Sequence, residues 1–224
     1  MKLLKSIFLI FLVFGYLTSF LSAQTKIPDS AALRKKRASV LEMELKEEHD
    51  PLKLKELAMI YSVIAGFDDQ EKTTAVKAEK IVQEAVSIYP KDYELMAVHG
   101  SLLTMMARYE TETARQLHFT KKGFRKMDRA IKQDPDNIGA LLQRGNNSMS
   151  VPLFLKRTHY AKKDFQHLLE LVGDRKGPSF KAMVLFNLGR AHELLQESSQ
   201  AKACWKEAKS MNAPYWSTQA NEKL

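Results

Sequence analysis

Residues 201–213 read AKACWKEAKSMNA, and three earlier stretches align with them without gaps. These are residues 78–90 (AEKIVQEAVSIYP), 123–135 (GFRKMDRAIKQDP) and 161–173 (AKKDFQHLLELVG). Each stretch begins with a small residue and carries a bulky residue four positions later, namely Val82, Met127, Phe165 and Trp205. The starts are 45, 38 and 40 residues apart, and recurrence at such a period is typical of a repeat protein.

A helical segment with a small central residue precedes each stretch. The central residue is glycine before the last three stretches and alanine before the first, in the order Ala58, Gly100, Gly145 and Gly189. A small residue lets one helix approach its partner, and we expect the bulky residue to fill the groove between successive helix pairs. Between Gln24 and Leu224 apolar residues recur with a helical period, and no stretch alternates as a strand does. The sequence therefore predicts an all-α chain.

The spacing of these residues resembles the tetratricopeptide repeat (TPR). The last unit, with Gly189, Ala201, Trp205 and Ala208, fits the TPR pattern best. The second unit carries about eleven additional residues around 108–119, and the third carries a few more at 151–157. The resemblance implies an α-solenoid of about four TPR-like helix pairs preceded by an N-terminal helix. It also implies a module that binds other molecules and catalyses no reaction.

Breaks in the helical pattern divide the chain into four predicted parts. They are a signal peptide (1–23), an N-terminal segment and helix (24–50), the TPR-like repeat domain (51–212) and a C-terminal tail (213–224). Ser30 and Asp50 are expected to cap helices, the second with Pro51 at its first position. Gly66 is expected to end the second helix near Ala65.

The first 23 residues have the features of an export signal. Lys2 and Lys5 precede an apolar run, residues 6–23, that contains no charge. Cleavage before Gln24 is the favoured prediction, and the alternative is an uncleaved membrane anchor, because the run approaches the roughly 20 residues that span a bilayer. Both alternatives place the body of the protein outside the cytoplasm, in the periplasm or the extracellular space.

Composition excludes several kinds of functional site. The single cysteine excludes an intramolecular disulfide, and the six histidines have no metal-ligand spacing. The nine glycines form no phosphate-binding loop, and no serine lies in a nucleophile elbow. We therefore expect no metal, no cofactor and no enzymatic activity.

The formal net charge is +9, and some of the lysines and arginines gather in clusters. They lie at residues 34–37, at Lys121-Lys122 with Arg125-Lys126, and at Lys162-Lys163. One interpretation is that they only solvate helix faces, and the other is that they favour an anionic membrane surface or partner. Nucleic acid is not expected, because the chain is predicted to be exported and no aromatic residues for base stacking are interleaved with the cations.

The TPR resemblance also predicts a binding surface, since the first helix of each TPR pair lines the concave face of the stack. The polar residues that map to it are Gln143, Asn146, Asn187 and Arg190, in two pairs spaced by three residues. Their amides and guanidinium favour a protein or extended peptide as partner, unless these groups only satisfy one another. The sequence thus predicts an interaction module of the cell envelope. The alternative is an accessory component of a solute transport system, whose small or apolar ligand would need an enclosed apolar cavity.

Overall fold

The computed structural model describes residues 27–173 and 175–224, and within these residues it contains helices and no strand. The α-helices are α1 (Ala31–Glu47), α2 (Pro51–Val63), α3 (Lys72–Ile88), α4 (Tyr93–Met106), α5 (Thr113–Gln133), α6 (Ile138–Met149), α7 (Thr158–Val172), α8 (Gly177–Leu194), α9 (Ser198–Ser210) and α10 (Pro214–Asn221). A π-helical turn, Ile64–Asp68, follows α2, and short 3-10 helices cover Ala107–Tyr109 and Leu153–Leu155. The all-α prediction is confirmed. None of the described helices combines the length and the apolar character that crossing a membrane requires.

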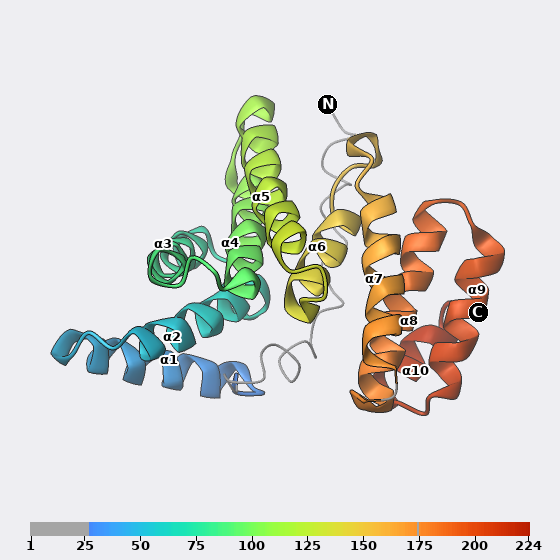
Figure 1. Cartoon of the computed structure of the whole chain (residues 1–224), viewed down its shortest axis with the longest axis horizontal. Helices are drawn as coiled ribbons and strands as arrows, with labels where there is room; N and C mark the ends of the chain where they lie inside the picture. Colours follow the sequence, from blue (N-terminus) through green and yellow to red (C-terminus); the bar gives the residue numbers. More distant parts are fainter. Residues whose placement is uncertain (1–26, 174) are drawn as a thin grey trace. The chain divides into compact units, whose positions relative to one another are not determined.

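The contacts divide the chain into two units, and the division falls inside α6. Unit 1 ends at Ala140, and unit 2 covers Leu141–Leu224. Residues 51–212 therefore contain parts of two compact units, where the sequence suggested one repeat domain. Figure 1 shows the helices of each unit in chain order.

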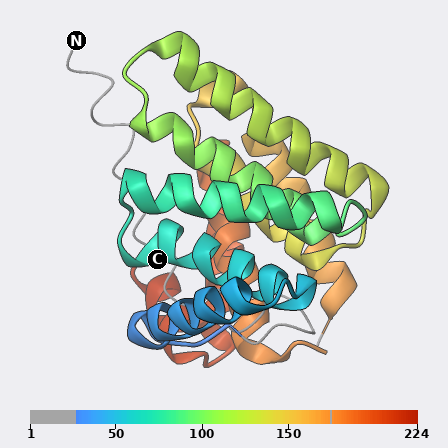
Figure 2. The ribbon, with the colours of Figure 1, turned by 90° about the vertical axis from the view of Figure 1, so that its left-hand side faces the viewer.

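Unit 1 is a series of helices in which each packs against the next, from α1 to α5 (Figures 1 and 2). Polar caps start α1 and α2 where the sequence predicts them. Ser30 Oγ accepts a hydrogen bond from the Leu33 amide at 3.2 Å, and Asp50 Oδ1 accepts one from the Leu52 amide at 2.8 Å. Each cap satisfies an amide that the first helical turn leaves without an intrahelical acceptor.

Gly66 does not end the second helix as predicted. The chain continues through the π-helical turn to Asp68, whose carboxylate accepts two hydrogen bonds from the Arg34 guanidinium, at 2.9 and 2.6 Å. Arg34 also donates to the carbonyls of Pro28 and Asp29. This buried ion pair ties the start of α1 to the end of α2. The contact with Arg34, which lies 34 residues away in sequence, accounts for the extra turn.

Small residues allow the close helix contacts that the repeat pattern predicts. A Cβ added at Gly100 would lie 2.6 Å from the Gly123 carbonyl oxygen, so α4 and α5 touch through their backbones. A Cβ at Gly145 would lie 2.9 Å from the Phe165 ring. Gly189 is in similarly tight contact with Trp205. These bulky residues fill a groove within their own pair, at its glycine, whereas the sequence predicted the groove between successive pairs.

Unit 2 ends in a helix that the sequence interpretation did not contain. Residues 213–224, predicted as a tail, include α10, which packs against α8 and α9. Trp216 is 3% exposed, and its ring lies 5.6 Å from that of Phe186, measured between centroids. Pro214 starts α10, because proline is favoured at the first helical position.

Candidate functional site

The four residues predicted to form the binding surface lie on the first helices of the last two pairs. Gln143 and Asn146 are on α6, and Asn187 and Arg190 are on α8, all within unit 2. Gln143 and Arg190 are half-buried, whereas Asn146 and Asn187 are buried. The amides are therefore less exposed than the sequence interpretation assumed.

Asn146 is the most unusual of the four. Only 4% of the residue is exposed, yet neither its Oδ1 nor its Nδ2 has a hydrogen-bond partner among the described residues. The nearby Ser148 hydroxyl, which is fully buried, also lacks one within the described part of the chain. A buried polar group without a partner costs about 1–3 kcal/mol, so native proteins normally supply one from the chain, from ordered water or from a ligand. The Asn146 carboxamide thus has an unused acceptor oxygen, Oδ1, and two unused N–H donors on Nδ2.

Asn187 and Arg190 are brought together by one turn of α8. Asn187 Nδ2 donates to the Met183 carbonyl at 3.1 Å, and its Oδ1 accepts a long hydrogen bond of 3.4 Å from Arg190 Nη1. No carboxylate of the described residues forms an ion pair with Arg190, because the neighbouring Glu193 is paired with Lys223 at 2.9 Å. Burial lowers the pKa of the Arg190 guanidinium, and the negative charge of Glu193 offsets this only in part. Arg190 is therefore a desolvated cation with spare donors.

An ion pair that sequence analysis missed fixes α6 against α7. Arg144 donates from Nε and Nη2 to the two carboxylate oxygens of Asp164, at 2.9 and 2.6 Å. The Tyr160 ring lies 5.1 Å from the Arg144 guanidinium and 3.9 Å from that of Arg157. Because successive helical residues are about 100° apart, Asn146 points away from the side of α6 that carries Arg144. The Arg144–Asp164 ion pair fixes one side of α6 against α7, and this fixes the direction in which the opposite side, with Asn146, faces.

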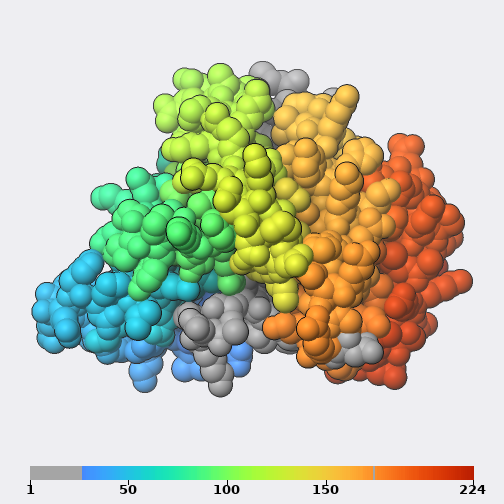
Figure 3. Space-filling view, in the orientation of Figure 1, coloured from blue at the N-terminus to red at the C-terminus, as the bar shows by residue number. Residues whose placement is uncertain are grey.

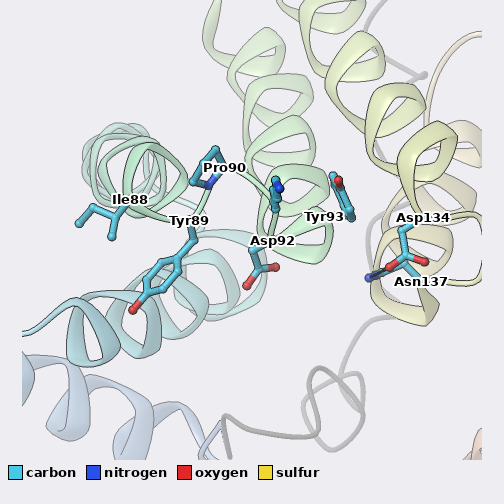
Figure 4. Close-up of a pocket in the computed structure, with 8 residues that line it drawn as sticks. Ile88, Tyr89, Pro90, Asp92, Tyr93, Asp134 and Asn137 are labelled. Atoms are coloured by element: carbon cyan, nitrogen blue, oxygen red, sulfur yellow. Dashed lines mark hydrogen bonds between the residues drawn. The ribbon is translucent and has the colours of Figure 1, made fainter.

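A surface depression of about 550 Å³ lies in unit 1, whereas the four candidate residues belong to unit 2 (Figure 4). Its lining comes from the turn between α3 and α4 and from the residues that follow α5: Ile88, Tyr89, Pro90, Lys91, Asp92, Tyr93, Asp134 and Asn137. Charged and amide side chains share this lining with Tyr89 and Tyr93, and the depression opens to the surface. It is therefore not the enclosed apolar cavity that the transport alternative requires.

A metal site is not formed by the residues that the structure describes. In 27–173 and 175–224, no three side chains from His, Cys, Asp and Glu are grouped so that they could hold an ion.

Comparisons with known proteins identify the fold. No family model matches the sequence, and no curated protein sequence is significantly similar to it. Among solved structures, the chain is similar to TTC0263, a thermophilic TPR protein in Thermus thermophilus, with a TM-score of 0.67 and 15% identity over 86% of this chain and 91% of that one. The chain has a TPR-like fold. It is also similar to MamA of strain AMB-1, with a TM-score of 0.52 and 14% identity over 81% of this chain and 91% of that one.

The TPR-like fold confirms the resemblance stated from the repeated residues. At 14 and 15% identity the two similarities show the fold alone. In this fold α6 and α8 are the first helices of successive pairs, the position from which the four candidate residues were predicted.

Proposed function

We propose that the protein is a non-catalytic interaction module that binds an extended peptide segment of a partner protein through α6 and α8. The observation that carries the proposal is the Asn146 carboxamide, which is buried with no hydrogen-bond partner among the described residues. A peptide backbone offers one donor and one acceptor per residue, which matches the free donor and acceptor of an asparagine.

Arg190 supplies the second contact. Its guanidinium is half-buried, makes one long hydrogen bond and has no ion-pair partner among the described residues. Such a group can donate two parallel hydrogen bonds to a carboxylate or bind a backbone carbonyl. In this proposal Asn146 binds the backbone amide of the partner peptide, and Arg190 binds a carboxylate or a backbone carbonyl of the same peptide. Gln143 and Asn187 border these two contacts on their own helices.

The test is a peptide selection followed by an affinity measurement. Peptides selected from a random 12-residue library are titrated against the purified protein by fluorescence anisotropy. The Asn146→Ala, Arg190→Ala double variant is expected to bind them at least about 100-fold more weakly, since each lost hydrogen bond involving a charged or buried group contributes about 1.5–3 kcal/mol.

A matched control carries Gln166→Ala and Lys206→Ala, which remove an exposed amide from α7 and an exposed cation from α9. The control should bind like the wild type. Equal binding by the folded double variant, or equal losses in both variants, would contradict the proposal.

We also propose that the protein acts outside the cytoplasm, in the cell envelope. The support is the amino-terminal sequence, with its two lysines and uncharged apolar run, which lies outside the described residues. Mass spectrometry of the protein from the envelope fraction should find a chain beginning at or near Gln24. An intact chain that resists carbonate extraction from membranes would instead show the anchored form.

A further inference from the structure

Helix α5 carries a dense row of cations on the side that faces away from the core of unit 1. Six of them fall within twelve residues: Lys121, Lys122, Arg125, Lys126, Arg129 and Lys132. Five are exposed and Lys126 is half-buried. The opposite side of α5 is buried through residues such as Phe124 and Met127. This set of six residues is called the α5 basic face below.

The structure distinguishes the α5 basic face from the other basic clusters. Arg34 and Arg37 form ion pairs with Asp68 and Glu56, and Lys162 forms one with Glu197. None of the six cations of the α5 basic face forms an ion pair within the residues that the structure describes. Its charge is therefore available to an external anion.

Two acidic groups adjoin the α5 basic face. They are Asp128 on α5 itself and Glu79 on α3, so the face retains a net positive charge. The pKa of Lys126 is lowered, first by burial and then by the positive charge of Lys122, with a smaller effect from Arg129. An external anion near Lys126 would thus stabilise the charged form of its ammonium group.

The geometry also makes the α5 basic face rigid. The backbone of α5 touches that of α4 at Gly123 and Gly100, so the helix cannot move outward from its partner without losing this contact. Figure 2 shows α5 running beside α4, and Figure 3 shows atoms of α5 at the molecular surface. From Lys121 to Lys132 the row spans about 16 Å, at 1.5 Å per helical residue.

We propose that the α5 basic face docks on a bilayer surface that carries anionic headgroups. Charge complementarity and the predicted export of the chain across a membrane favour this occupant. Mobile headgroups can match a straight row of flexible lysines and arginines without a shaped pocket. Between Lys121 and Lys132 the only aromatic residue is Phe124, which is buried, so the face offers no stacking platform for a nucleic acid.

Vesicle sedimentation tests the proposal with the purified protein. Vesicles of phosphatidylcholine with 30% phosphatidylglycerol are compared with pure phosphatidylcholine at 0.15 M salt. The wild type should bind only the anionic vesicles, and raising the salt to 0.5 M should release it. The Lys122→Gln, Arg125→Gln, Arg129→Gln variant should bind about a hundred-fold more weakly, because each cation near an anionic surface contributes to binding independently.

The matched control is Lys202→Gln, Lys206→Gln, Lys209→Gln, which removes the same charge from exposed positions of α9. It should lose at most a few-fold in binding, and circular dichroism should show both variants folded. Equal losses in the two variants would overturn the proposal, since they would reflect net charge alone. Binding to poly-glutamate but not to anionic vesicles would also overturn it and would indicate an acidic protein partner.

Discussion

Replacing Gly123 by alanine is expected to lower the free energy of unfolding by about 3 kcal/mol, because overpacking at a backbone contact cannot be relieved by a side-chain rotation. The new Cβ would lie 2.9 Å from the Thr104 amide nitrogen and closer still to the Gly100 carbonyl oxygen. Helices α4 and α5 would have to separate. Urea denaturation followed by circular dichroism measures the change.

Gly66→Ala is the matched control for this prediction. The nearest atom to a Cβ there is the Met105 methyl carbon at 3.6 Å, which is ordinary van der Waals contact. The stability of the Gly66→Ala variant should equal that of the wild type or be slightly higher, because alanine favours a helical backbone more than glycine does. Equal stability of the Gly123 and Gly66 variants would show that α4 and α5 do not touch through their glycines.

Asp164→Ala is expected to lower the free energy of unfolding by about 3 kcal/mol, because it removes a buried carboxylate that accepts two hydrogen bonds from the Arg144 guanidinium. The two side chains are 2% and 12% exposed. The double variant Arg144→Met, Asp164→Leu should recover most of the loss, since it removes both charges and keeps the volume. Thermal and urea unfolding of the single and double variants measure both effects.

Glu193→Ala provides the surface comparison. Its carboxylate lies 2.9 Å from Lys223 Nζ, but both side chains are well exposed. This variant should change stability by no more than about 0.5 kcal/mol. If Asp164→Ala had an equally small effect, the Arg144–Asp164 pair would not fix α6 against α7.

The repeat pattern predicted the helix pairs because their packing depends on local spacing. Gly145 and Phe165 lie twenty residues apart, and their contact follows from the period of the repeat. Helix α10 was missed because the sequence interpretation ended the repeat domain at residue 212 and treated residues 213–224 as a tail, whereas Pro214 begins a helix there. The sequence interpretation assigned no structure to the additional residues around 108–119. Most of them form the N-terminal part of α5.

The candidate site was only partly accessible from sequence. Spacing placed Asn146 and Arg190 on the first helices of their pairs, which is where the structure has them. It could not give their burial, because the residues that cover a side chain come from helices distant in sequence. For the same reason it could not show that Asn146 lacks a hydrogen-bond partner among the described residues or that Asp164 takes the charge of Arg144.

The most direct test of the proposed binding function is the NMR signal of the Asn146 side-chain amide during titration with a selected peptide. The signal is assigned as the one that disappears in Asn146→Ala. A hydrogen bond to the peptide should shift both amide protons in proportion to occupancy and slow their exchange with solvent. Unchanged Asn146 signals, while resonances elsewhere in the protein respond to the same peptide, would show that the peptide binds at another surface.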